Sequence, residues 1–257
     1  MKDVIAVVTG AAGGIGVAVA EALAARGASV ALLDKDADRL DVVAKELRGA
    51  GHRATAFPVD VTSSEDVDTA IEAVEERLGP VDRLVNAAGV LRTGAVDGFA
   101  DEDWQATFAV NTTGVFHVSR AVVRRMRQRR RGALVTVASN AASTARMDMA
   151  AYAASKAAAS MFTKCLGLEN AAYGIRCNVV APGSTDTPML TALWDDEAAA
   201  RAASVDGVPE AFRIGIPLAK VARPQDIADA VLFLLSDEAA HITMHHLTID
   251  GGAALGA

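Results

Sequence analysis

The chain has 257 residues, of which 51% are hydrophobic, 22% are charged and only 4% are aromatic. This balance excludes a disordered chain and favours a compact globule whose core is built mainly from aliphatic side chains. The formal net charge of -7 argues against nucleic acid or an anionic membrane surface as a partner. We expect the basic run at residues 124–131 to be a solvated helix end rather than a nucleic-acid patch.

Targeting, thiol and metal signals are weak. The amino terminus enters a short apolar run without a basic region or a cleavage site, so we expect no signal peptide and a cytoplasmic protein. Cys165 and Cys177 have no CxxC spacing and are expected to be reduced core thiols. His241, His245 and His246 lack carboxylates or thiolates at ligand spacing, so we expect no metal site.

Short apolar runs alternate with longer segments of helical periodicity along the whole chain. The runs cover residues 4–9, 29–34, 54–59, 83–86, 133–138, 176–181 and 247–250. Strands that alternate with helices predict a single doubly wound, Rossmann-type α/β domain over residues 1–257, with a seven-stranded, mostly parallel sheet. The irregular stretch 183–216 follows a strand end and is therefore a candidate substrate lid.

A glycine-rich turn follows the first predicted strand, with the spacing TGxxxGxG. Gly10, Gly14 and Gly16 would let the backbone turn tightly and approach a pyrophosphate, with Ile15 at the start of the helix. The position between a strand and a helix suits a dinucleotide site. The alternative is a turn that only allows close helix packing.

Acidic and small residues end the next strands at the same edge. Asp34, 24 residues after Gly10, is placed to accept hydrogen bonds from adenosine ribose hydroxyls and to repel a 2′-phosphate, which favours NAD over NADP. Lys35 follows it and weakens that preference, and Asp34 could instead cap the next helix. Candidate cofactor contacts also end the third and fourth strands, at Asp60, Val61, Asn86 and Gly89.

Tyr152 and Lys156 are four residues apart in a predicted helix over residues 150–172 and share one helix face. A neighbouring ammonium would stabilise a phenolate, which makes Tyr152 a candidate catalytic base. Ser139 ends the fifth strand at the same edge, and Asn111 is expected to begin a helix and hold a water that leads protons to Lys156. The alternatives are that Ser139 is only a turn residue, that Asn111 is a helix cap, and that Tyr152 and Lys156 are a surface pair.

These motifs together resemble the short-chain dehydrogenase/reductase family over essentially the whole chain. The matching residues are Thr9 to Gly16, residues 86–89, Asn111, Ser139, Tyr152 to Lys156, Pro182 with Gly183, and Thr187. The resemblance implies hydride transfer to a nicotinamide, a grip of Lys156 on the nicotinamide ribose, and a carboxamide held by the backbone around Thr185. It also implies a homo-oligomer, for which we expect a tetramer.

Further segments, such as GALVTVASNAAS and GIRCNVVAPGSTDTPM, resemble members of the family that oxidise a cyclohexadiene hydroxy acid at C3 to an aromatic acid. The implied reaction is 2,3-dihydro-2,3-dihydroxybenzoate to 2,3-dihydroxybenzoate, in siderophore biosynthesis. The alternative substrate is 2,3-dihydro-3-hydroxyanthranilate. Asn140 replaces an expected acid, and residues 147–149, Met-Asp-Met, replace an expected Ile-Gly-Met, so the departures fall where substrate recognition is expected.

The hypothesis assigns Tyr152 to removal of the C3 hydroxyl proton. Arg146 is the first candidate to bind a ring carboxylate and Arg92 the second, because a guanidinium presents paired donors to a carboxylate. The alternative for both arginines is an ordinary surface charge. Asn140, Met147 and Met189 complete the candidate substrate contacts. A hypothesis of another class is a non-catalytic NAD-sensing or scaffold protein with the same fold.

Overall fold

The fold is built around one parallel sheet. A computed structural model describes residues 1–192 and 196–256. The spatial order of the strands is β3 (Arg53–Pro58), β2 (Ser29–Asp34), β1 (Ile5–Thr9), β4 (Arg83–Asn86), β5 (Gly132–Val137), β6 (Ile175–Pro182) and β9 (His246–Ile249). Every neighbouring pair in this sheet is parallel. The predicted doubly wound fold with seven strands is therefore confirmed, and each predicted strand lies within one residue of the observed one.

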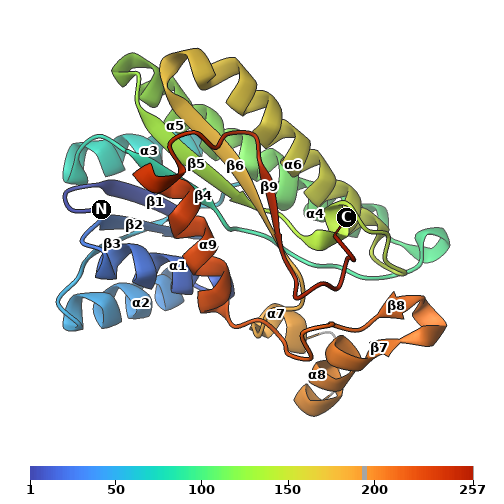
Figure 1. Ribbon diagram of the computed structural model, residues 1–257. Coiled ribbons are helices and arrows are strands. Elements are labelled where there is room, and N and C mark those ends of the chain that lie inside the picture. The colour runs from blue at the N-terminus through green and yellow to red at the C-terminus, as the bar shows by residue number, and fades with distance from the viewer. Residues whose placement is uncertain (193–195, 257) are drawn as a thin grey trace.

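Helices cover both faces of the sheet (Figure 1). One face packs against α1 (Gly14–Ala25), α2 (Ala37–Gly49) and α9 (Pro224–Leu235), and the other against α3 (Ser64–Leu78), α5 (Val115–Arg129) and α6 (Ala150–Asn170). Aliphatic side chains dominate both cores, as the low aromatic content predicts. Strands buried on both faces explain why the runs read as continuous rather than alternating apolar segments.

Local signals fix where the main helices begin. The Asp36 side chain accepts a hydrogen bond from the Arg39 N–H at the start of α2, and the Ser63 side chain accepts one from the Asp66 N–H at the start of α3. Pro224 opens α9, where a proline costs no helix hydrogen bond. Because the seven strands are parallel, their carboxyl ends and the loops that follow them lie at one edge of the sheet.

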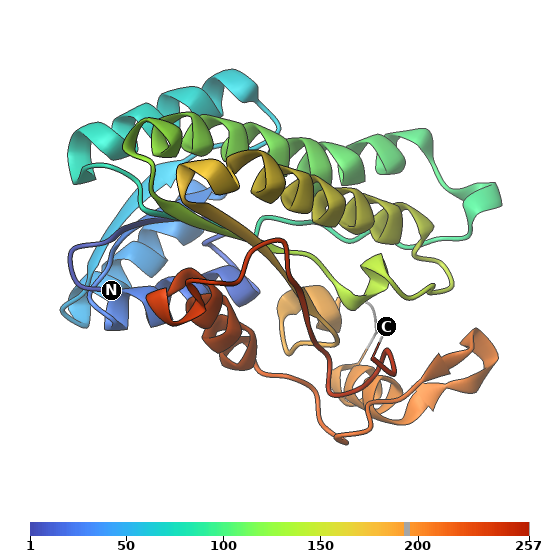
Figure 2. The ribbon, with the colours of Figure 1, turned by 45° about the horizontal axis from the view of Figure 1, so that its top comes forward.

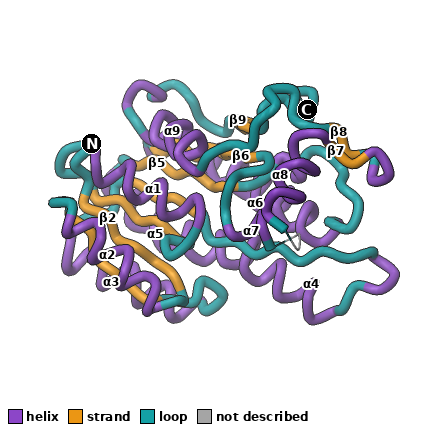
Figure 3. Tube along the Cα trace, turned by 90° about the horizontal axis from the view of Figure 1, so that it is seen from below, coloured by secondary structure: helices purple, strands orange, loops and turns teal. Residues whose placement is uncertain are grey.

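Small elements after β6 form a separate group at that edge. They are α7 (Pro188–Thr191), α8 (Glu197–Asp206), and the antiparallel pair β7 (Gly207–Val208) and β8 (Arg213–Ile214). Figure 2 shows this group beside the C-terminal segment, and Figure 3, seen from below, shows β7 and β8 at the opposite end of the molecule from α2 and α3, with α7 nearer the middle. Ile216, Val221 and Ala253 pack together between the group and the C-terminal segment. That residues 183–216 act as a substrate lid stays a prediction, and residues 193–195 of that range lie outside the described residues.

The two cysteines differ in their exposure. Cys177 is buried as expected, but Cys165 is exposed on α6, so the expectation of two core thiols is wrong for Cys165.

The basic run is a helix end, as expected, since α5 ends at Arg129. Several of its arginines are paired rather than free, because Arg125 and Arg129 both bridge to Glu75. Across residues 1–192 and 196–256, no helix is both long and apolar enough to cross a membrane.

Candidate active site

A cavity of about 860 Å³ lies along the carboxyl ends of the strands, between the sheet edge and the segment after β6. Its volume is in the range that small-molecule and cofactor sites occupy. The predicted site residues that line it are Gly10, Gly14, Ile15, Gly16, Asp34, Asp60, Val61, Gly89, Ser139, Asn140, Arg146, Met147, Tyr152, Lys156, Thr185 and Met189. Residues from distant parts of the chain therefore meet at one site.

The glycine-rich turn is shaped by close backbone approaches. Gly10 has a φ of +68°, and a Cβ there would lie 2.7 Å from the backbone nitrogen of Ala88. A Cβ on Gly16 would collide with the carbonyl oxygen of Gly10, so both positions require glycine. Helix α1 begins just after Gly13 with no side-chain cap and no acidic residue in its first turn. Its N-terminal amides are left for an anion at the cavity wall.

The Asp34 carboxylate is held at the end of β2. Its Oδ2 accepts a hydrogen bond from the Ala12 N–H at 3.2 Å, and its Oδ1 accepts one from the Asp36 N–H at 3.1 Å. The side chain that caps α2 is Asp36, so the alternative of Asp34 as the helix cap is wrong. Lys35 lines the cavity beside it. The wall at this point thus combines one fixed carboxylate with one lysine.

Asp60 is also oriented by its own loop. Its Oδ1 accepts hydrogen bonds from the N–H and the hydroxyl of Thr62, at 2.9 and 2.8 Å. The bond from the Thr62 N–H is the main reason why the pKa of Asp60 lies below its usual value. Asp60 is therefore a fixed negative charge at the cavity, next to Val61.

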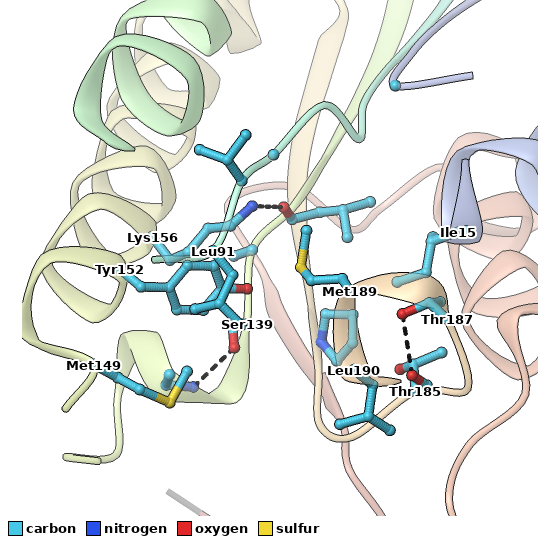
Figure 4. Close-up of a pocket in the computed structure, with 18 of the residues that line it drawn as sticks. Ile15, Leu91, Ser139, Met149, Tyr152, Lys156, Thr185, Thr187, Met189 and Leu190 are labelled. Atoms are coloured by element: carbon cyan, nitrogen blue, oxygen red, sulfur yellow. Dashed lines mark hydrogen bonds between the residues drawn. The ribbon is translucent and has the colours of Figure 1, made fainter. Parts of the chain in front are cut away.

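Ser139, Tyr152 and Lys156 lie side by side in the cavity wall, as Figure 4 shows, with Thr187 and Ile15 on the facing side. Tyr152 and Lys156 project from α6, and both are buried, with 7% and 5% of their surface exposed. The alternative of a surface pair is therefore wrong. Lys156 Nζ lies 5.8 Å from the centre of the Tyr152 ring. Ser139 follows β5, and its Oγ accepts a hydrogen bond from the Ala141 N–H at 3.2 Å.

Burial sets the ionisation of this group. It raises the pKa of Tyr152, and a hydrogen bond with Ser139 acts in the opposite direction. It also lowers the pKa of Lys156 to about 8. The chain alone therefore favours the neutral phenol. A phenolate at Tyr152 needs further positive charge beside it.

Asn111 does not lie at the start of a helix, where the sequence analysis places it. It lies in a π-helical turn, Ala109–Gly114, between α4 (Asp101–Phe108) and α5. Its side chain exchanges hydrogen bonds with the N–H and carbonyl of Val90, both at 2.9 Å, and donates to Ser155 Oγ at 3.0 Å. Asn111 does not line the cavity. It holds the loop after β4 against α6.

Two other predicted residues lie outside the cavity. Asn86 is 2% exposed and donates from Nδ2 to Ser119 and Thr136, so its side chain joins β4 to α5 and β5. Arg92 is paired with Asp103 at 3.0 Å, and about half of its side chain is exposed. Direct contacts of these two side chains with a ligand in the cavity are therefore not supported.

The end of the cavity near the C-terminal segment carries Arg146, Asn140 and Arg213. Arg146 Nη2 donates to the carbonyl of Ala253 at 3.4 Å, and Asn140 Nδ2 donates to Asp250 Oδ2 at 3.1 Å. Arg213 is a lining residue that the sequence analysis missed, because it lies in an irregular segment without a motif. Leu91 and Leu190 also line the cavity and were not predicted, because no motif marks them, whereas Thr187, which matched a family signature, lines it too.

The chain matches the model of the short chain dehydrogenases over residues 4–198. It is 56% identical to a 2,3-dihydro-2,3-dihydroxybenzoate dehydrogenase of Bacillus subtilis over 252 residues, 98% of this chain and 96% of that protein. It is 45% identical to the protein of that name from Escherichia coli, over 97% of this chain and 96% of that one. A gluconate 5-dehydrogenase of Burkholderia cenocepacia, solved with NADP and tartrate, superposes with a TM-score of 0.91 at 33% identity, covering 100% of this chain and 97% of that chain.

The chain belongs to the short-chain dehydrogenase family. It is an oxidoreductase that acts on a CH–OH group. The expected resemblance to the dihydrodihydroxybenzoate dehydrogenases within the family is confirmed by the relatives from B. subtilis and E. coli.

The cavity fits the nicotinamide dinucleotide of short-chain dehydrogenases. The turn is closely packed at Gly10 and Gly16, whereas a Cβ on Gly13 would meet nothing within 4 Å, so the cavity wall is open there. The uncapped start of α1 suits a pyrophosphate, and the Asp34 carboxylate at the end of β2 suits ribose hydroxyls. Within residues 1–192 and 196–256, no group of His, Cys, Asp or Glu side chains could hold a metal ion.

Proposed function

We propose that this dehydrogenase uses NAD to oxidise 2,3-dihydro-2,3-dihydroxybenzoate at C3, giving 2,3-dihydroxybenzoate for siderophore biosynthesis. The observation that carries the proposal is one cavity lined by Ser139, Tyr152 and Lys156 as well as by Arg146. A proton acceptor and a carboxylate-binding guanidinium are thereby available to the same ring acid. The similarity to the B. subtilis and E. coli proteins supports the choice of ring.

Tyr152 and Ser139 would act on the C3 hydroxyl. In the proposal Ser139 Oγ hydrogen-bonds this oxygen and the Tyr152 phenolate takes its proton. When bound, the nicotinamide accepts the hydride that leaves C3. The C3 ketone of the ring then tautomerises to the aromatic diol, and the gain of aromaticity favours oxidation.

Lys156 would stabilise the Tyr152 phenolate and hold the nicotinamide ribose. Its buried Nζ lies close to the tyrosine ring, and a Cβ on Gly89 would lie 3.1 Å from it, so the chain after β4 also passes beside this charge. The backbone around Thr185, which follows β6, would hold the carboxamide. This turn is fixed, because the Thr185 hydroxyl donates to the Gly183 carbonyl and the Asp186 N–H donates to the Ala222 carbonyl. Asp34 supports NAD rather than NADP, since its carboxylate repels a 2′-phosphate.

The substrate ring would lie between these residues and the segment after β6. Met189 extends from α7 into the cavity near Tyr152, as Figure 4 shows, while Met147 and Asn140 line the wall from the loop after β5. In this arrangement residues 183–216 cover the ring as a lid. The ring carboxylate would point toward Arg146.

We also propose that the chain forms a homo-oligomer, a tetramer, in the cytoplasm. Apolar side chains on the outer faces of α5 and α6 support this, since Phe116, Met161 and Leu168 are 39%, 59% and 69% exposed. Light scattering on the purified protein measures the number of chains directly.

The function is tested by mixing the purified protein with each dihydro acid and either NAD or NADP. We expect NADH to appear with the dihydroxy acid and NAD, and 2,3-dihydroxybenzoate to be identified by mass. Faster NADH formation from 2,3-dihydro-3-hydroxyanthranilate than from the dihydroxy acid would identify the amino analogue as the substrate instead. Absence of NADH with both acids and with a panel of cyclic alcohols would contradict the proposal and favour a non-catalytic nucleotide-binding protein.

A further inference from the structure

The segment after β6 brings a second arginine to the cavity. Arg213, on β8, lines the cavity, and its Nη2 donates to Ser184 Oγ at 2.9 Å. Among the residues that the structure describes, no carboxylate forms an ion pair with Arg213. A guanidinium in such a position retains donors for an anion from outside the chain.

Arg146 and Arg213 are close enough to affect one another. Burial lowers the pKa of Arg213, and the positive charge of Arg146 lowers it further. Arg146 is likewise half-buried, which lowers its pKa, and the negative charge of Asp250 acts in the opposite direction. Two cations that face one cavity without direct ion pairs are stabilised when an anion binds between them.

The lid holds Arg213 in a defined place rather than on a loose loop. A Cβ on Gly207 would lie 2.6 Å from the backbone nitrogen of Gly215, so the two strands of the hairpin approach closely. The Ile216 N–H donates to the Val205 carbonyl at 2.9 Å, which fixes the end of the hairpin to α8. With its side chain bound to Ser184, Arg213 is pre-organised at the cavity wall.

Ser204, on α8, gives a second, independent indication of a ligand at this wall. Its side chain is only 1% exposed, its Oγ has no hydrogen-bond partner, and the residue lines the same cavity. A buried hydroxyl without a partner costs free energy unless a ligand completes its hydrogen bond.

We propose that Arg213 and Ser204 form, with Arg146, the carboxylate-binding site of this enzyme, with two of its three residues carried by the lid. The inference rests on the proposed function and names the residues that select an acidic ring. The uncapped start of α1 would hold the pyrophosphate of the cofactor, which would leave these arginines for the substrate. Binding of the acid thereby connects the lid to the wall that carries Arg146.

Guanidinium groups donate charge-assisted hydrogen bonds to a carboxylate, so this site would discriminate between rings with and without a carboxylate. Hydrogen bonds to charged groups are worth enough that loss of one donor weakens binding by about 10- to 100-fold. A ring without the carboxylate makes none of these bonds. Removal of Arg213 should therefore affect acids and spare neutral rings.

The test measures binding of the product acid, 2,3-dihydroxybenzoate, and of catechol, the same ring without the carboxylate, to the NAD-saturated protein by calorimetry. We expect Arg213→Gln to weaken binding of the acid about 10- to 100-fold and to leave catechol binding unchanged. Ser204→Ala should weaken the acid less. Arg201→Gln, in the same lid but paired with Asp186 on the surface, is the matched control and should change neither.

Equal weakening of both ligands by Arg213→Gln, or a loss with Arg201→Gln of the same size, would overturn the proposal. Unaltered acid binding in Arg213→Gln would overturn it too. The proposed function fails differently, because then the wild-type protein makes no NADH from the dihydro acid. Binding of the product requires no turnover, so the two failures are distinguishable.

Discussion

Lys156 Nζ donates a hydrogen bond to the carbonyl oxygen of Val137 at 3.0 Å, and this bond ties α6 to the end of β5. The ammonium is buried to make it, so its pKa falls from 10.5 to about 8. Between these two values the unfolded chain binds more protons at this site than the folded one, so the contribution of Lys156 to stability rises with pH across that window.

We therefore expect Lys156→Met to be more stable than the wild type at pH 7 by about 2–3 kcal/mol, and nearly inactive. The difference in unfolding free energy should shrink as pH rises from 8 toward 10.5, as measured by urea unfolding without cofactor. Lys45→Met, on the exposed face of α2, is the control and should show no such trend. A pH-independent difference for Lys156→Met would contradict a lowered pKa.

Tyr152→Phe should lower kcat by about 100- to 10,000-fold, the range of general acid–base catalysis, without unfolding the protein. Burial raises the pKa of Tyr152, so the phenol is mainly protonated at neutral pH. In the wild type the reactive phenolate should therefore become more populated, and kcat/KM higher, as pH increases through the neutral range. Steady-state rates across pH, with NAD binding followed by fluorescence, check both points. Retention of a near-normal rate by the variant, with its pH dependence intact, would remove Tyr152 from the chemistry.

The parts of the site that follow from local periodicity could be predicted from the sequence. Two residues four apart on a helix share a face in any packing, so Tyr152 and Lys156 were placed together correctly. Parallel strands bring their carboxyl ends to one edge, which placed Asp34 and Ser139 at the same cavity. These inferences need only the type and order of the elements.

The rest depends on tertiary contacts that no local pattern encodes. Arg213 reaches Arg146 from 67 positions further along the chain, through a hairpin of two-residue strands without periodicity. Asn86 ends a strand at the correct edge, but its amide turns into the layer between sheet and helix because Ser119 and Thr136 offer it partners there. Asn111 lies in a π-helical turn, which has no sequence signature of its own.

Asp34 and Asp36 form a matched pair for testing cofactor choice. Asp34→Ser removes the carboxylate that would repel a 2′-phosphate, so we expect a lower KM for NADP and a higher one for NAD, each by about tenfold. Asp36→Ala removes the cap of α2 and should cost about 1 kcal/mol of stability with no change of preference. Kinetics with both cofactors and thermal unfolding separate these effects, and an unchanged NAD to NADP ratio in Asp34→Ser would contradict the role of Asp34.

Substitutions at Gly13 and at Gly16 distinguish an effect on cofactor binding from an effect on folding. At Gly16 a methyl group would collide with the Gly10 carbonyl, so Gly16→Ala should lower the melting temperature even without cofactor. At Gly13 the backbone is extended and a Cβ meets nothing within 4 Å, so Gly13→Ala should cost at most about 1 kcal/mol, as a weaker helix cap. The added methyl group would nevertheless occupy the open wall at the start of α1.

The rise in melting temperature on adding NAD should therefore be smaller for Gly13→Ala than for the wild type, because ligand stabilisation scales with affinity. Gly49→Ala, where a Cβ also meets nothing within 4 Å but far from the cavity on α2, is the control. It should keep the full rise and be slightly more stable, as expected for alanine in a helix. A full NAD-induced rise in Gly13→Ala would show that a methyl group at this position does not contact the pyrophosphate.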